Sequence, residues 1–209
     1  MKNSIQSIGI VSLFVCLLVA PVTGQNWIQG TPAPGATAAT YTVSTGFTSM
    51  VMSVPGAGHV TFNGFDINGG VDLNPRFGAA LDTTYARASN LFGTQHGGHV
   101  LTILAGPVFY PVERGKNRMF VHALVGMGIV DGVAPSSFEN YSSGWVRGTS
   151  YAFGGGAEHF LRGPLSVRVS GDYMRTPFIN YSRSVQPQND FRVTAGMVLA
   201  LPRIGGLGR

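Results

Sequence analysis

The sequence is poor in charged residues, and this shortage limits the classes of protein it can belong to. Only 11% of the 209 residues are charged, against about 25% in ordinary soluble domains. The hydrophobic share of 44% excludes a charge-rich, intrinsically disordered chain. The 30 glycines and 12 prolines argue against long helices or a coiled coil. The first question is therefore how a folded surface with so few charges meets its solvent.

Long apolar runs are also missing after the N-terminal region. The best candidates, residues 100–112 and 119–130, are well under the ~18 residues of a membrane-spanning helix, and glycine or proline interrupts each. If the folded chain lies in a membrane, it must form a closed barrel. Only helices and closed barrels satisfy every backbone hydrogen-bonding group in lipid.

Cysteine occurs once, at Cys16, inside a segment typical of a secretory signal peptide. Lys2 gives a positive start, residues 8–20 are apolar, and small residues precede an expected cleavage site at Gln25. We expect a signal peptide over 1–24; the alternative is a single membrane-anchoring helix. Cleavage would leave a chain without cysteine, and hence without disulfides or thiol chemistry.

From residue 41 onward the sequence alternates between apolar and small or polar residues, which is typical of strands with two unlike faces. Residues 25–40 are expected to be a flexible lead-in and residues 202–209 a C-terminal tail. The alternation predicts eight strands: 41–53, 62–73, 77–88, 99–110, 119–130, 149–160, 165–175 and 191–201. The segment 99–110 is ambiguous because both its faces are apolar, and Pro107 suggests a bulge there.

The connections between these strands alternate in length. Short basic turns are expected at 74–76, 112–118 and 161–164, and longer polar loops at 89–98, 131–148 and 176–190; the loop at 54–61 is short. This pattern predicts an all-β fold over 41–201, an eight-stranded antiparallel up-and-down transmembrane β-barrel. The alternative is a soluble, lipocalin-like barrel. We favour the membrane barrel because the polar face has few charges and Lys116 is the only lysine after residue 24.

Three stretches resemble the OmpA/OmpX-type superfamily of small outer-membrane β-barrels. They are residues 63–66 running to 74–78 and Asp82, residues 154–158 followed by 167–169 and 172–173, and residues 189–196. The resemblance implies a place in the bacterial outer membrane, with outer-membrane lipid and the barrel-assembly machinery as partners. One departure concerns the last strand, which usually finishes on an aromatic residue in this superfamily but here ends at Leu201.

The resemblance also implies an orientation. Both chain ends and the short turns would face the periplasm, and the loops 54–61, 89–98, 131–148 and 176–190 would face outward. The basic turn residues expected at the periplasmic rim are Arg76, Arg114, Lys116, Arg118 and Arg162.

Charged residues on the polar, lumen-facing side form the first candidate site. They are Asp66, Asp72, Asp82, Glu158, Arg168, Asp172 and Arg192. Reflecting the hairpin about Gly163 places Glu158 opposite Arg168 across two strands. One interpretation is a charged constriction that selects small solutes. We favour a polar plug, because eight strands leave an interior just wide enough for side chains to fill.

The outer loops form the second candidate site, because two of them share a short repeat at 138–142 and 178–182. The expected contact residues are Phe138, Tyr141, Trp145, Arg147, Phe178, Tyr181 and Arg183. They could contact anionic lipopolysaccharide or an unknown extracellular ligand. For the aromatic residues we favour the alternative, a girdle that anchors the barrel at the membrane surface.

Motifs for catalysis, metals and nucleic acids are weak or missing. His96 and His99 form an H-x-x-H pair in a loop, with no acidic or cysteine partner nearby. The basic residues are spread along the chain, which argues against nucleic-acid binding. We expect no enzyme activity, cofactor or metal, but a small barrel with a largely plugged polar lumen that serves envelope integrity or surface interaction. The alternatives are a narrow channel for small solutes or hydrophobic compounds and a lipid A-modifying enzyme, for which no nucleophile motif is found.

Overall fold

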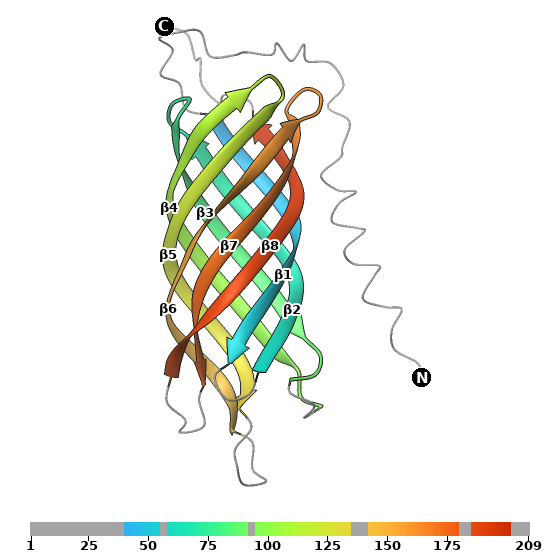
Figure 1. The fold of residues 1–209 in the computed structure, drawn as a ribbon, viewed down its shortest axis with the longest axis vertical. Coiled ribbons are helices and arrows are strands. Elements are labelled where there is room, and N and C mark those ends of the chain that lie inside the picture. Colours follow the sequence, from blue (N-terminus) through green and yellow to red (C-terminus); the bar gives the residue numbers. More distant parts are fainter. Residues whose placement is uncertain (1–39, 55–57, 92–94, 135–141, 180–184, 202–209) are drawn as a thin grey trace, which may run out of the picture. The chain divides into compact units, whose positions relative to one another are not determined.

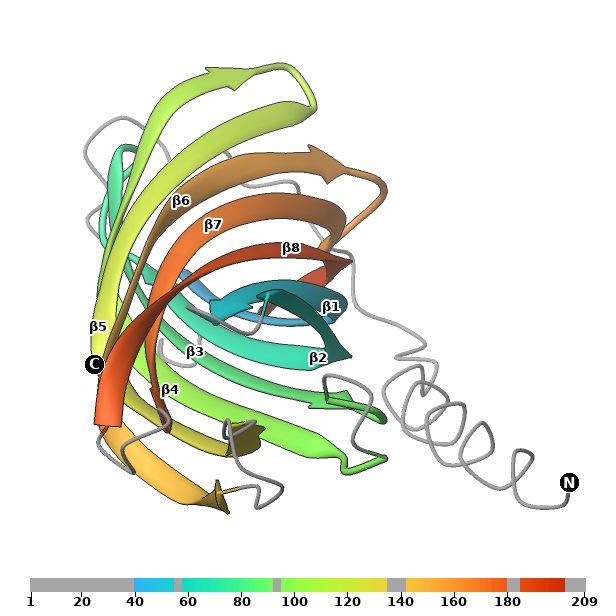
Figure 2. The ribbon, with the colours of Figure 1, turned by 60° about the horizontal axis from the view of Figure 1, so that its bottom comes forward.

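The computed structural model describes residues 40–54, 58–91, 95–134, 142–179 and 185–201, and these form one closed antiparallel barrel (Figures 1 and 2). Each strand pairs with its neighbours in the chain, and β8 pairs with β1 to close the ring. The strands are β1 (Thr40–Val54), β2 (Gly58–Asp72), β3 (Phe77–Ala88), β4 (Gly98–Arg114), β5 (Asn117–Ala134), β6 (Ser142–Phe160), β7 (Leu165–Ile179) and β8 (Val185–Leu201). The predicted eight-stranded up-and-down barrel is confirmed.

Several predictions fall on other parts of the chain. The expected signal peptide over 1–24, the lead-in up to residue 39 and the tail over 202–209 lie outside the described residues. Within the described ranges, no helix has the length and apolar character needed to cross a membrane.

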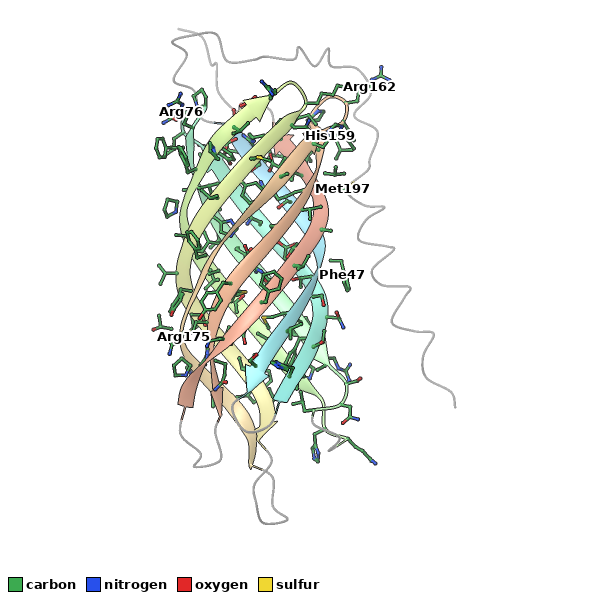
Figure 3. The ribbon with its side chains drawn as sticks, viewed as in Figure 1. Phe47, Arg76, His159, Arg162, Arg175 and Met197 are labelled. Atoms are coloured by element: carbon green, nitrogen blue, oxygen red, sulfur yellow. The ribbon has the colours of Figure 1, made fainter. Side chains whose placement is uncertain are left out.

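The alternation in the sequence becomes an apolar exterior around a mixed interior. Along β5, Met119, Val121 and Val125 point outward and are 41–59% exposed, whereas Phe120 and His122 are buried. Phe47 and Met197 project from the outer surface in the same way (Figure 3). So continuous an apolar surface is costly in water but matches the outward-facing apolar band of a membrane barrel. The low charge content of the sequence therefore reflects an exterior that suits lipid.

The strands extend further than predicted at the end of the barrel that carries the longer loops. β5 runs to Ala134 and β6 begins at Ser142, so most of the loop expected at 131–148 is paired strand. β7 and β8 likewise extend to Ile179 and from Val185, within the loop expected at 176–190. These segments are rich in glycine, serine and proline, which have low strand propensity. Their pairing with a neighbouring strand overrides that preference.

At the opposite end, which we call the turn end, three short turns join the hairpins. Each turn is connected to the following hairpin by one backbone hydrogen bond of 2.8 Å. The amide groups of Tyr110, Phe160 and Ala200 donate to the carbonyl oxygens of Arg76, Lys116 and Pro164, respectively. The turn end is therefore a continuous hydrogen-bonded rim, and we call the other end of the barrel the loop end.

A bulge interrupts the pairing of β4 with β5. The register shifts between Phe109 and Val112, close to the position that Pro107 suggested. Before the shift the even-numbered Tyr110 is buried in the lumen; after it the even-numbered Val112 is exposed on the outside. Bulges re-aim side chains in this way, and here the bulge turns Val112 outward, whereas Tyr110 keeps the inward direction of the even-numbered residues before it.

The apolar exterior predicts a depth-dependent response to charge. Phe47 lies at the middle of β1, and Tyr41 lies near its turn end. We expect Phe47→Arg to lower the free energy of unfolding by about 2–4 kcal/mol and Tyr41→Arg by about 0–1 kcal/mol, because charge costs most at the bilayer midplane. Urea unfolding of the barrel folded into lipid vesicles measures both. Equal losses at the two positions would contradict a lipid-facing exterior.

Candidate functional site

The interior of the barrel divides into two halves of different chemistry. Toward the turn end, most inward side chains are charged or polar, and they surround a small apolar group of Val108, Tyr110 and Phe120. Toward the loop end they form an apolar cluster: Met50, Met52, Val60, Phe62, Ala86, Ala88, Leu91, Val100, Leu104, Leu124, Val130, Ala152 and Met174. The expectation of a largely polar lumen is therefore wrong for the loop-end half. That expectation overlooked the apolar residues at inward positions near the ends of the strands.

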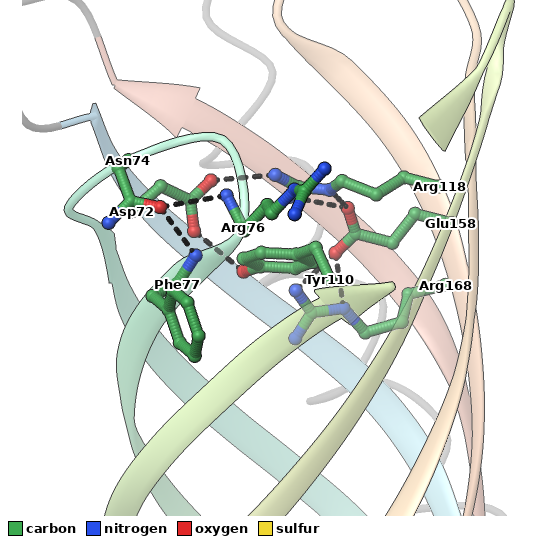
Figure 4. Close-up of polar contacts among 8 residues, drawn as sticks. All are labelled: Asp72, Asn74, Arg76, Phe77, Tyr110, Arg118, Glu158 and Arg168. Carbon is green, nitrogen blue, oxygen red and sulfur yellow. Dashed lines mark hydrogen bonds and ion pairs between the residues drawn. The ribbon is translucent and has the colours of Figure 1, made fainter. Parts of the chain in front are cut away.

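A network near the turn end, which we call the turn-end network, consists of Asp72, Tyr110, Arg118, Glu158 and Arg168 (Figure 4). The Arg118 guanidinium donates to Asp72 Oδ2 at 2.7 Å and to Glu158 Oε2 at 2.7 Å. Arg168 Nε donates to the other oxygen, Glu158 Oε1, at 2.6 Å. The Tyr110 hydroxyl donates to Asp72 Oδ1 at 2.6 Å. Each carboxylate thus has partners from at least two strands.

Aromatic rings fill the space around these arginines. The Arg118 guanidinium lies 4.1 Å from the centroid of the Tyr110 ring, and that of Arg168 lies 4.9 Å from the Phe120 ring. A cation over an aromatic face is attracted by the ring quadrupole, more strongly where water is excluded. The rings therefore close the lumen near the turn end while stabilising the charges within it.

A second network, the central network, consists of Asp82, Thr84, His122, Asp172 and Arg192. Arg192, which is 1% exposed, donates from Nη1 to Asp82 Oδ1 at 2.8 Å and from Nε to Asp172 Oδ2 at 2.9 Å. His122 Nε2 lies 2.7 Å from Asp172 Oδ1. The network joins β3, β5, β7 and β8 across the lumen. Its charges are hydrogen-bonded, as buried charges must be if they are not to destabilise the fold.

The seven charges expected in the lumen all lie on the inner side of the barrel. The structure places Asp72, Glu158 and Arg168 in the turn-end network, and Asp82, Asp172 and Arg192 in the central network. Glu158 is opposite Arg168 in the β6–β7 register. Asp66 stands apart, beside a cavity of about 20 Å³.

One residue expected elsewhere belongs to the lumen. Arg118 was expected at the periplasmic rim, but its side chain is 11% exposed and turns inward. That expectation was wrong because a turn of seven residues was assumed, whereas β5 begins at Asn117. Arg76 and Arg162 are exposed at the turn end, as expected of rim residues (Figure 3).

Two further lumen residues were not identified from the sequence. Tyr110 lay in the ambiguous segment, where both faces are apolar and the alternation could not show which face is inward. Asp190, 2% exposed, lay in an expected loop. Asp190 and the inward-facing Arg192 are both even-numbered, so extending the alternation of the last strand by two residues would have predicted that Asp190 faces the lumen.

Only part of the outer-loop candidate site is described. Trp145 is 64% exposed, and its ring stacks on that of His99 with centroids 6.2 Å apart. Arg147 is exposed two residues further along β6. Only the backbone of Phe178 is described, as part of β7. Four of the expected contact residues lie outside the described residues: Phe138, Tyr141, Tyr181 and Arg183.

The H-x-x-H pair consists of His96, in the β3–β4 connection, and His99, in β4. The structure gives no support for a metal site at this pair. The Tyr85 hydroxyl is 2.8 Å from His99 Nδ1, so this ring nitrogen already has a partner. Across the described part of the chain, no three His, Cys, Asp or Glu side chains gather in a way that could hold a metal ion.

The turn-end network predicts a specific loss of stability. Glu158→Gln removes the carboxylate shared by Arg118 and Arg168, and leaves two partly buried cations short of a partner. We expect the free energy of unfolding to fall by about 3–5 kcal/mol, the usual cost of breaking a buried pair. Glu113→Gln, an exposed change near the same end, is the control, with an effect within about 0.5 kcal/mol. Similar urea midpoints for both variants would contradict the network.

Comparison with solved structures identifies the fold. No family model matches the chain, and no curated protein matches it in sequence. Ail, the attachment invasion locus protein of Yersinia pestis, aligns with 79% of this chain and 100% of its own at 17% identity, with a TM-score of 0.55. Neisserial surface protein A aligns with 76% of this chain and 96% of its own at 11% identity, with a TM-score of 0.61.

A second structure of Ail, in complex with the heparin analogue sucrose octasulfate, aligns with 78% of this chain and 99% of its own at 16% identity, with a TM-score of 0.53. At these identities the likeness is one of fold, and it extends over the whole length of the compared barrels. The chain has the fold of the OmpA/OmpX-type small outer-membrane β-barrels.

Proposed function

We propose that this protein is a bacterial outer-membrane barrel with a closed lumen, which serves envelope integrity and contacts molecules at the cell surface through its loop end. The observation that carries the proposal is the combination of an apolar exterior with a filled interior. The exterior suits lipid. The interior is occupied along its length by the two networks and the apolar cluster.

Closure of the lumen is favoured over conduction. Arg192 connects β8 to β3 and β7, and Arg118 connects β5 to β2 and β6. A hydrated solute moving through the barrel would have to separate these pairs and then cross the apolar cluster. Both steps are costly, because buried charges would lose their partners and a polar solute its water.

Surface contact is supported by outward-facing side chains near the loop end, of which Arg175 is half-buried and the others are exposed. Trp145 and Arg147 lie on β6, and Arg87 and Arg175 are on β3 and β7. Arginine pairs well with phosphate and sulfate groups, and tryptophan supplies an apolar face at an interface. Because Ail was solved with a sulfated sugar, we propose an anionic saccharide, such as the phosphorylated head of lipopolysaccharide, as the ligand class.

The remaining expectations become part of this proposal. A cleaved signal peptide over 1–24 would deliver the chain across the inner membrane, and the barrel-assembly machinery would insert it. The basic turn residues Arg76, Arg114, Lys116 and Arg162 would then face the periplasm. The proposed role needs no catalysis, and an unchanged lipid A mass in cells that overproduce the protein is the expected result against the enzyme alternative.

Membrane location and closure are tested on the native protein. We expect it to fractionate with the outer membrane, to shift its gel mobility on heating, and to give no steady conductance in a planar lipid bilayer. A soluble periplasmic protein would overturn the membrane assignment. Steady conductance of the wild-type barrel would instead support the narrow-channel alternative and overturn the closed lumen.

The ligand class is tested at the loop end. We expect the double variant Arg147→Gln, Arg175→Gln to elute from immobilised heparin at a lower salt concentration than the wild type, because surface ion pairs are screened by salt. The matched control is Arg162→Gln at the turn end, which should elute with the wild type. Equal elution of all three proteins would contradict a saccharide site at the loop end.

A further inference from the structure

Four basic side chains at the turn end have no acidic partner within the described part of the barrel. Arg76 lies in the β2–β3 turn, Arg114 and Lys116 at the β4–β5 turn, and Arg162 in the β6–β7 turn, and all four are exposed. None of them forms an ion pair in the described ranges. In the same turns Glu113 is the only exposed acid that the structure describes. The described part of the rim therefore has an excess of positive charge.

The turns hold these bases on a fixed backbone. Asn74 Oδ1 accepts hydrogen bonds from the amide groups of Arg76 and of the following residue, both at 2.9 Å (Figure 4). The other two turns are tight, with Gly115 and Gly163 at φ values of 60° and 62°, a region that glycine enters without strain. The fold therefore sets the positions from which the exposed basic side chains extend.

Apolar side chains on the outer surface adjoin the bases. Leu161 directly precedes Arg162 in the chain. Beyond the bulge Val112 faces outward, and Arg114 shares its face because side chains alternate along a strand. The rim thus places charge directly beside an apolar surface, as a lipid places its head group beside its acyl chains. The outward apolar residues near the bases are 43–56% exposed: Leu73, Phe77, Val112, Met119 and Leu161.

The bases are spread around the barrel and are not gathered at one point. Two strands separate each of the three turns from the next along the ring, and Arg76 and Arg162 lie on opposite sides of the turn end in Figure 3. A compact ligand would contact one turn, whereas a partner that surrounds the barrel would contact all three. A lipid leaflet around the turn end is a partner of this second kind.

We propose that the turn end binds anionic phospholipids of the leaflet that surrounds it, with the four bases contacting lipid phosphates and the adjoining apolar side chains contacting acyl chains. Basic side chains are attracted to an anionic lipid surface, and their stems cover apolar surface while the charge stays in the head-group layer. A zwitterionic lipid carries an ammonium group that offsets its phosphate, so an excess of bases favours lipids with a net negative charge. The inference rests on the membrane location in the proposed function and concerns the end of the barrel opposite the saccharide site.

The test measures the lipid selectivity of the full-length barrel folded into phosphatidylcholine vesicles. A trace of spin-labelled phosphatidylglycerol or spin-labelled phosphatidylcholine is added, and electron paramagnetic resonance gives the fraction of labelled lipid that the protein immobilises. At low salt we expect the wild type to favour phosphatidylglycerol by about two- to fivefold, the upper value corresponding to about 1 kcal/mol for one base near a lipid surface. In about 1 M NaCl the ratio should fall toward one, because the Debye length shortens to about 3 Å.

Two matched variants assign the preference to the turn end. The neutral variant, Arg76→Gln, Arg114→Gln, Lys116→Gln, Arg162→Gln, should lose roughly half of the preference or more, because the charges that attract the lipid are gone. The charge-retaining variant, Arg76→Lys, Arg114→Lys, Arg162→Lys, should keep it. A shift of gel mobility on heating shows that each variant is folded.

The outcomes separate this inference from the proposed function. A wild-type barrel that folds into the vesicles but immobilises both labelled lipids equally would overturn the inference and leave the membrane location standing. A full preference in the neutral variant would place the lipid contacts elsewhere on the barrel, and its loss in the charge-retaining variant would contradict recognition by charge. Failure of the wild type to fold into vesicles would instead overturn the membrane location, and the inference with it.

A second pair of variants covers the case in which the neutral variant does not fold. Arg76→Gln and Arg162→Gln each change one exposed side chain in a different turn. Each should lower the phosphatidylglycerol preference by itself, because the bases act at separate places around the ring. An unchanged preference in both single variants would overturn the inference.

Discussion

The narrow interior of an eight-stranded barrel is the constraint on which this structure depends. Such an interior is just wide enough for side chains to fill, so each inward charge must find its partner on another strand. Glu158 meets this requirement by binding arginines from β5 and β7, and Arg192 by binding carboxylates from β3 and β7. Some of these bonds join neighbouring strands, whereas Arg192–Asp82 and Arg118–Asp72 connect strands on opposite sides of the lumen.

The two halves of the lumen differ in how they are filled. Charged pairs occupy the half next to the turn end, where the rim hydrogen bonds add to the strand pairing. The apolar cluster, with Met50, Met52 and Met174 among its members, fills the half that adjoins the loops. Methionine adapts its shape to irregular space, which helps it fill this half of the lumen.

The sequence was sufficient to predict the fold because alternation of period two is a local property. It assigned Phe47 to the exterior and Arg192 to the interior without knowledge of their neighbours. Reflection about Gly163 also suggested the Glu158–Arg168 pair, since a tight hairpin fixes its own register. These predictions needed no information from outside a single strand or hairpin.

The features that the sequence did not predict depend on contacts between residues far apart in the chain. Arg192 and Asp82 are 110 residues apart, and no local pattern could have joined them. The outward direction of Val112 depends on a bulge, and the true ends of β5 and β6 depend on their pairing with each other. The cavity beside Asp66 is lined by residues from six strands, so the sequence indicated an acid in the lumen but not which residues would surround it.

The rim has a consequence for how the barrel comes apart. At the turn end, the three hydrogen bonds to the carbonyl oxygens of Arg76, Lys116 and Pro164 add to the strand pairing that joins each hairpin to the next. Strand separation that starts at that end must break these bonds together with the adjacent ion pairs. Separation from the loop end breaks the backbone pairing of strands whose inward side chains are mainly those of the apolar cluster. Fraying is therefore directional. We expect the loop end, which carries the surface side chains, to separate before the turn end.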